Sequence, residues 1–191
     1  MIVVSGLPRS GTSLMMKMLQ AGGLRLVTDS RRAADVDNPD GYFEDERVKL
    51  LASGESGWLA DHSGQAVKII SALLEYLPPR HQYKILFMER EIDEILQSQN
   101  KMLRRRGETS TLSDTAMKEE FIQHLSALKF WLARQPNVQV LYINYNKMVV
   151  DSDSFCRAIA DFIELPLDLE KMRSVPDQKL YRNRSTPEKH R

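Results

Sequence analysis

The sequence has little cysteine and little net charge. Cys156 is the only cysteine among 191 residues, which excludes an internal disulfide and a cysteine-based metal cluster. The 27 basic and 26 acidic side chains leave a formal net charge of +1. Because the charges nearly cancel, composition favours neither nucleic acid nor a membrane surface as a partner.

Long hydrophobic runs are absent as well. No apolar run approaches the ~20 residues of a membrane span, and no signal peptide precedes the first predicted strand. These absences predict a cytoplasmic protein without a membrane partner. A chain of this length fits one domain with a substantial core, so residues 1–191 are expected to form a single domain. A basic tail from about residue 176 is expected to be mobile.

The first nineteen residues predict a strand, a glycine loop and a helix. Ile2 to Val4 is a short β-branched run, which indicates a buried strand, and Gly6 and Gly11 bracket a tight loop. From Thr12, apolar residues recur at helical spacing. In this arrangement backbone N–H groups and a helix N-terminus converge on one anion.

The loop has the glycine spacing of a Walker A motif but not its lysine. Thr12 stands after Gly11, where a lysine would reach the phosphates of a nucleoside triphosphate, and the cation inside the loop is Arg9. The loop is therefore predicted to bind a phosphate and a neighbouring group, without the residues that hold a triphosphate and Mg²⁺. A P-loop kinase or NTPase stays open as the alternative.

Further strands are predicted at 66–70, 83–88 and 138–143, and helices alternate with them. Ser71 is the expected N-cap of a helix at 72–77, and Ser113 or Asp114 that of a helix reaching Leu132. The alternation indicates an α/β domain with a mostly parallel sheet flanked by helices. Ligands of such sheets bind beyond the carboxyl ends of the strands. A long polar stretch from Gly22 to about residue 41 shows no periodic pattern.

Two motifs carry a family resemblance. Leu7-Pro-Arg-Ser-Gly-Thr-Ser13 resembles the 5′-phosphosulfate-binding loop of sulfotransferases that use 3′-phosphoadenosine 5′-phosphosulfate (PAPS), in the form seen in tyrosylprotein and many bacterial members. Arg90, with Ser98 eight positions later, resembles the family's 3′-phosphate-binding signature. Segments 38–44 and 180–184 also resemble those of bacterial members. The alternative interpretation of Arg90 is an ion pair with Glu94 on the surface of the helix.

The resemblance implies a P-loop NTPase-like sulfotransferase fold, PAPS as co-substrate and no metal. The implied reaction is in-line transfer of a sulfonate group to a hydroxyl or amine of a small-molecule or peptide acceptor, whose identity is not predicted; nor is the oligomeric state. A non-catalytic nucleotide-binding module is the third interpretation. The implied PAPS-binding residues are Pro8, Arg9, Ser10, Gly11, Thr12, Ser13, Arg90, Ser98, Arg182 and Arg184.

Four residues are candidates for the chemistry. Arg9 is expected to stabilise charge on the leaving phosphate. The resemblance implies a Glu or His as the base that takes the acceptor proton; Glu44 is the first candidate and His62 its competitor. For Glu44, complementing the dipole of a helix is an equal alternative. Lys68, in the second predicted strand, resembles the lysine that contacts the transferred sulfonate.

Overall fold

The computed structural model describes residues 1–29, 31, 35 and 41–176. A five-stranded sheet runs through it in the order β2-β3-β1-β4-β5, and every pair of neighbouring strands is parallel. The strands are β1 (Ile2–Gly6), β2 (Leu26–Val27), β3 (Ala66–Lys68), β4 (Tyr83–Glu89) and β5 (Val138–Asn144). The predicted α/β class with a parallel sheet is confirmed.

The described residues also form six α-helices and three 3₁₀-helices. The α-helices are α1 (Thr12–Ala21), α2 (Ile92–Arg105), α3 (Asp114–Leu132), α4 (Tyr145–Val150), α5 (Ser152–Ile163) and α6 (Leu169–Arg173). The 3₁₀-helices are η1 (Glu46–Ser53), η2 (Gly57–His62) and η3 (Ser71–Tyr76). Among the described helices, none has the length and apolar character to cross a membrane.

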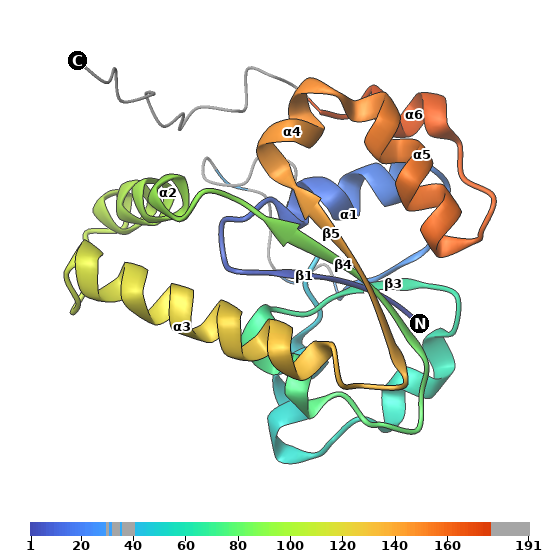
Figure 1. The fold of residues 1–191 in the computed structure, drawn as a ribbon, viewed down its shortest axis with the longest axis horizontal. Coiled ribbons are helices and arrows are strands. Elements are labelled where there is room, and N and C mark those ends of the chain that lie inside the picture. The colour runs from blue at the N-terminus through green and yellow to red at the C-terminus, as the bar shows by residue number, and fades with distance from the viewer. Residues whose placement is uncertain (30, 32–34, 36–40, 177–191) are drawn as a thin grey trace.

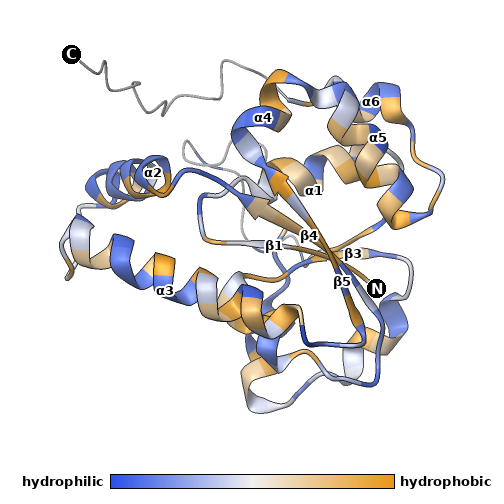
Figure 2. Cartoon of the chain, in the orientation of Figure 1, coloured by the Kyte–Doolittle hydropathy of each residue, from blue (hydrophilic) through white to orange (hydrophobic). Residues whose placement is uncertain are grey.

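Alternation along β1 divides the core between the two faces of the sheet. Ile2 and Val4 point into one cluster, with buried residues of α1, α5 and α6, whereas Val3 points into the other, with residues of η1, η3 and α3. Figure 1 shows α1, α4, α5 and α6 on one side of the sheet and α3 on the other. The central strands are mostly apolar in Figure 2, as expected of strands covered on both faces.

Some local predictions were wrong. Ser71 is the first residue of η3 rather than its N-cap, which is Ile70, and Ser71 is buried. The two-residue β2 lies inside the stretch in which no element was predicted, and α4 follows β5 at once. The predicted cap Ser113 is confirmed, since its side chain accepts a hydrogen bond from the Ala116 N–H.

The carboxyl ends of four strands meet at one edge of the sheet. In the register of the sheet, Val4 of β1 pairs with Lys68 of β3, and Gly6 of β1 pairs with Met88 of β4. Glu89 of β4 pairs with Asn144 of β5. The glycine loop, Lys68, Arg90 and the start of α4 therefore share this edge, where parallel sheets bind their ligands.

Candidate functional site

Close packing requires glycine at both ends of the loop between β1 and α1. A Cβ on Gly11 would lie 2.4 Å from Cδ2 of Tyr145, and one on Gly6 would lie 2.6 Å from the Met88 carbonyl oxygen. Gly11 also has φ of +103°, in the region that favours glycine. The loop is thus pressed against β4 and α4, and Arg9 inside it takes φ of +71°, unusual for a residue with a side chain.

The loop leads into the N-terminus of α1, which is a candidate anion site. The cap residue Gly11 offers no side-chain hydrogen bond, and the first turn contains no acidic residue. Ser10 is fully buried, and its Oγ has no hydrogen-bond partner within the described residues. A buried hydroxyl without a partner is costly, so an acceptor brought by a ligand would relieve this cost. The loop fits a phosphate group on this ground.

Lys68 extends from the end of β3 toward the start of α1. Its Nζ lies 3.4 Å from Ser13 Oγ and 3.2 Å from Glu44 Oε1, and it also donates to the Tyr42 carbonyl oxygen. The Lys68 side chain is only 7% exposed, against 35% for Glu44. The structure therefore brings two of the predicted catalytic residues into contact beside the loop and leaves the carboxylate open to solvent.

Two hydrogen bonds hold the backbone at Glu44. Its carbonyl oxygen accepts from Thr28 Oγ1 at 3.0 Å and from the Asp29 N–H at 3.1 Å, both just after β2. Phe43 has φ of +50°, an uncommon conformation for an aromatic residue. Strained backbone persists where its surroundings fix it, and it often does so at functional sites.

Arg9 and Ser98 are joined across the loop and α2. Arg9 Nε donates to Ser98 Oγ at 3.0 Å, and Arg90 donates from Nη1 to the Arg9 carbonyl oxygen at 3.2 Å. The two motifs found in the sequence thus form one cluster with two guanidinium groups and a hydroxyl. The Arg9 side chain points toward the predicted 3′-phosphate residue Ser98.

Arg90 also forms the ion pair with Glu94, and the pair is buried rather than on the surface. Arg90 Nε lies 2.9 Å from Glu94 Oε2, with side-chain exposures of 8% and 0%. Glu94 accepts a second hydrogen bond, from Asn146 Nδ2 at 3.0 Å. The Arg90 guanidinium lies 4.5 Å from the centre of the Tyr145 ring, and burial raises the pKa of the Tyr145 hydroxyl.

His62 lies in a different group of side chains. Its Nε2 is 3.3 Å from Nη2 of Arg47, whose guanidinium stacks over Trp58. Within the described part of the chain, no hydrogen bond or ring contact joins His62 to Glu44, Lys68 or the loop. The geometry thus favours Glu44 over His62. Pro8 is exposed, and Thr12 opens α1. Arg182 and Arg184, residues 38–40 of the segment 38–44, and the tail from 177 lie outside the described residues.

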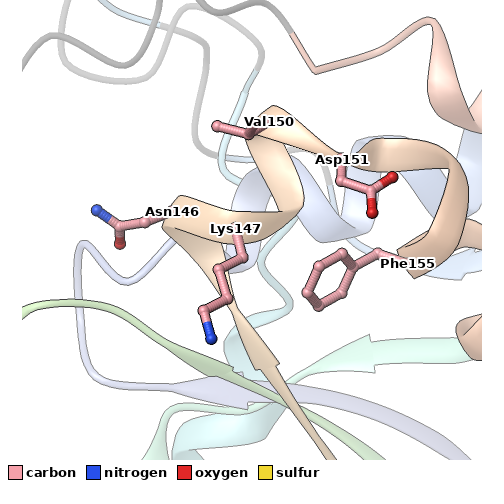
Figure 3. Close-up of a pocket in the computed structure, with 5 residues that line it drawn as sticks. All are labelled: Asn146, Lys147, Val150, Asp151 and Phe155. Carbon is pink, nitrogen blue, oxygen red and sulfur yellow. The ribbon is translucent and has the colours of Figure 1, made fainter.

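A pocket of about 540 Å³ lies at α4 and the start of α5 (Figure 3), lined by Asn146, Lys147, Val150, Asp151 and Phe155. Asn146 links it to the Glu94 network, but none of the residues predicted from sequence lines it. Across residues 1–29, 31, 35 and 41–176, no group of three His, Cys, Asp or Glu side chains could hold a metal ion.

Sequence reasoning missed Tyr42, Tyr145 and Asn146. Tyr145 and Asn146 directly follow β5, so the rule that placed Arg90 at the carboxyl end of β4 could have found them. Tyr42 takes part through its backbone oxygen, which leaves no signal in the residue type.

Comparison with known proteins identifies the family. The family model described as sulfotransferase domain matches residues 1–187. The structure resembles mouse sulfotransferase SULT7A1 complexed with PAP, at TM-score 0.57 and 16% identity over 99% of this chain and 67% of that one. This likeness shows a shared fold.

Two other structures are less similar. Retinol dehydratase in complex with androsterone and inactive cofactor PAP matches at TM-score 0.49 and 15% identity, over 92% of this chain and 62% of that one. An unliganded sugar kinase from Janibacter sp. HTCC2649 matches at TM-score 0.45 and 12% identity, over 85% and 93%. No curated protein sequence matches this chain.

The fold and the loop define an α/β protein with a parallel sheet and a candidate anion site at the carboxyl edge of that sheet. More particularly, the chain belongs to the sulfotransferase domain family, whose model spans nearly all of it. The closer resemblance of its loop to that of tyrosylprotein sulfotransferases stays a prediction.

Proposed function

We propose that the protein transfers a sulfonate group from PAPS to a hydroxyl or amine of a small-molecule or peptide acceptor. The proposal rests on the contact between the two motifs. Arg9 donates a hydrogen bond to Ser98, and Arg90 donates one to the carbonyl oxygen of Arg9. One subsite is the loop with the N-terminus of α1, and the other is this cluster. Two adjacent anion sites suit a nucleotide with phosphates at its 5′ and 3′ positions.

Different residues have different roles in the transfer. When bound, PAPS supplies an activated sulfonate, whose transfer forms a bond from sulfur to the acceptor while the bond from sulfur to the 5′-phosphate oxygen breaks. The loop N–H groups and the α1 N-terminus stabilise the negative charge that builds on the leaving phosphate, and Arg9, which donates to Ser98 in the neighbouring cluster, adds positive charge from that side. Glu44 takes the acceptor proton on a carboxylate oxygen.

Lys68 connects the start of α1 to Glu44. Its ammonium group contacts both Ser13, in the first turn of α1, and the Glu44 carboxylate. It is placed to balance negative charge on a sulfonate near the loop, and it holds Glu44 beside that position.

Nucleotide selectivity tests the proposal against the P-loop kinase alternative. A ligand that binds only the folded state adds about 2.7 kcal/mol of stability at a hundred times its Kd. Adenosine 3′,5′-bisphosphate should raise the melting temperature of the protein, whereas ATP with Mg²⁺ at the same concentration should raise it far less. The reverse order would support a kinase or NTPase.

Turnover separates an enzyme from a nucleotide-binding module. Incubation with PAPS carrying a labelled sulfonate and a panel of phenols, alcohols, amines and tyrosine peptides should transfer label to at least one class. Bisphosphate binding without transfer to any class would favour the module. A cytoplasmic location stays a prediction.

A further inference from the structure

Glu94 is a fully buried carboxylate beside the Arg90 guanidinium of the candidate site. It lies on the first turn of α2, and its side chain is 0% exposed. A buried charge persists only where it is paired and hydrogen-bonded. Glu94 meets both conditions, with Arg90 Nε at 2.9 Å and Asn146 Nδ2 at 3.0 Å.

These contacts fix the plane of the Arg90 guanidinium. Two of its donors are directed by acceptors at known places: Nε by Glu94, and Nη1 by the Arg9 carbonyl oxygen at 3.2 Å. The Tyr145 ring lies against the group, 4.5 Å from its central carbon. A guanidinium is rigid and planar, so two directed donors and a stacked ring determine its orientation.

The network also ties together three segments that are far apart in sequence. Arg90 lies between β4 and α2, with Glu94 in the first turn of α2; Asn146 belongs to α4, and Arg9 belongs to the glycine loop. The orientation of the guanidinium therefore depends on contacts from all three segments. A charged ligand bound by Arg90 therefore meets a group that is oriented before binding, which lowers the cost of ordering it.

We propose that Glu94, held by Asn146, is a positioning residue that orients Arg90 to recognise the 3′-phosphate. The inference rests on the proposed function. Glu94 acts by geometry rather than by charge, because a carboxylate beside the subsite repels the incoming phosphate. Its contribution to orientation must therefore exceed this repulsion, and the two effects can be separated by substitution.

The test measures the affinity for adenosine 3′,5′-bisphosphate relative to that for 5′-AMP, which lacks the 3′ group. Glu94→Ala removes both orientation and charge, so the preference should fall at least about tenfold, as expected when a hydrogen bond to a charged group is lost. The affinity for 5′-AMP should stay within about twofold of wild type, a change worth less than the loss of one hydrogen bond.

Glu94→Gln is the conservative variant. The Gln oxygen can still accept from Arg90 Nε, and the Asn146 amide can turn over to accept from the Gln amide. Orientation is kept and repulsion is removed, so the preference for the bisphosphate should equal or exceed that of wild type. Glu91 is a matched control: it is exposed, precedes α2 and makes no side-chain cap hydrogen bond, so Glu91→Gln and Glu91→Ala should leave the preference unchanged.

Two further variants cover poor folding of Glu94→Ala. Asn146→Ala removes one of the hydrogen bonds that hold Glu94, and should reduce the preference by a smaller factor in the same direction. In an Arg90→Ala background, Glu94→Ala should cause no further loss of preference, because the residue acts only through Arg90.

Other results would overturn the inference. Equal loss of affinity for both ligands in Glu94→Ala would make Glu94 a structural residue only. A gain of preference in both Glu94→Ala and Glu94→Gln would mean that Glu94 holds Arg90 away from the ligand. A wild-type protein without preference for the bisphosphate would refute the proposed function itself, which is a separate outcome.

Discussion

At the scale of single residues, Lys68 and Glu44 share one interaction but differ in exposure. The ammonium group is nearly buried at the end of β3, whereas about a third of the Glu44 side chain is exposed, at 35%. The carboxylate can therefore reach an acceptor from solvent while one of its oxygens stays near Lys68. An acceptor proton taken by Glu44 would leave Lys68 positive beside the group being transferred.

Glu44→Gln tests the base. Gln keeps the size and polarity of Glu but takes no proton at neutral pH, so turnover should fall by about 10² to 10⁴. Affinity for adenosine 3′,5′-bisphosphate should hardly change. His62→Ala is the matched variant and should stay active, because His62 contacts Arg47 and Trp58. An active Glu44→Gln together with an inactive His62→Ala would transfer the role to His62.

Arg9→Ala tests the charge inside the loop. Loss of a donor to a developing negative charge costs about 10² or more in turnover. Because Arg9 also donates to Ser98, affinity for the bisphosphate should fall while affinity for 5′-AMP falls less. Isothermal titration with both ligands measures this, with circular dichroism as the control for folding. Turnover within a few-fold of wild type in a folded variant would remove Arg9 from the mechanism.

At the scale of elements, most of the fold could be predicted from periodicity and residue type. The four longer strands contain apolar runs, and the helices α1, α2, α3 and α5 repeat apolar residues at helical spacing, so the sequence predicts both. The two-residue β2 is too short to have a period, and it exists only because Leu26 and Val27 pair with β3. The helix predicted at 72–77 is the 3₁₀-helix η3, and the helix whose dipole Glu44 was expected to complement is the 3₁₀-helix η1.

The site was predictable in its residues but only partly in its contacts. Arg9, Lys68, Arg90 and Ser98 were found because they follow motifs or strand ends. The hydrogen-bond partners of these side chains depend on features that no local sequence pattern encodes, such as the positive φ of Arg9 and the register of β1 against β4. The ion pair of Arg90 with Glu94 follows from helical spacing, yet its burial against Tyr145 comes from the packing of α4.

The start of η1, directly after Glu44, offers a test of how the charge of Asp45 contributes to stability. Asp45 caps this helix: its Oδ1 accepts from the Arg47 N–H at 3.0 Å, and both carboxylate oxygens accept from the Arg47 side chain. These hydrogen bonds, the side-chain ones first, lower the pKa of Asp45 below its usual value. A carboxyl with a lowered folded-state pKa stabilises the fold above its unfolded pKa, and that contribution is lost as pH falls through the folded pKa.

Asp45→Asn keeps the cap and removes the charge. It should lower the free energy of unfolding by about 1 kcal/mol at pH 7, since Arg47 is partly exposed. The difference from wild type should shrink below about pH 4, where Asp45 of the unfolded chain takes up a proton. Urea titrations at several pH values measure it, with Glu46→Gln as the exposed control. A difference that does not depend on pH would show that the charge of Asp45 contributes nothing.

At the scale of the whole molecule, the site exists only in the folded chain. Its residues come from the ends of β1, β3, β4 and β5, from α1 and α2, and from the segment after β2, so no single segment holds a subsite alone. A ligand that joins the loop to α2 therefore stabilises the assembly as a unit. The face of the sheet that carries α1 also carries α5 and α6, so these helices should share the stabilisation.

Cys156 can report that stabilisation. The thiol lies on α5, 0% exposed in the cluster that includes α1, and burial raises its pKa to about 11. Alkylation by iodoacetamide at pH 8 should therefore require opening of the fold, because both access and thiolate are lacking in the native state. Adenosine 3′,5′-bisphosphate at a hundred times its Kd should slow labelling by about a hundredfold, the factor by which it reduces the open population. 5′-AMP at the same concentration should slow it less, and denatured protein should label at once. Labelling that neither ligand nor low urea affects would mean that α5 opens independently of the site. In that case α1 and α5 would not belong to one cooperative unit.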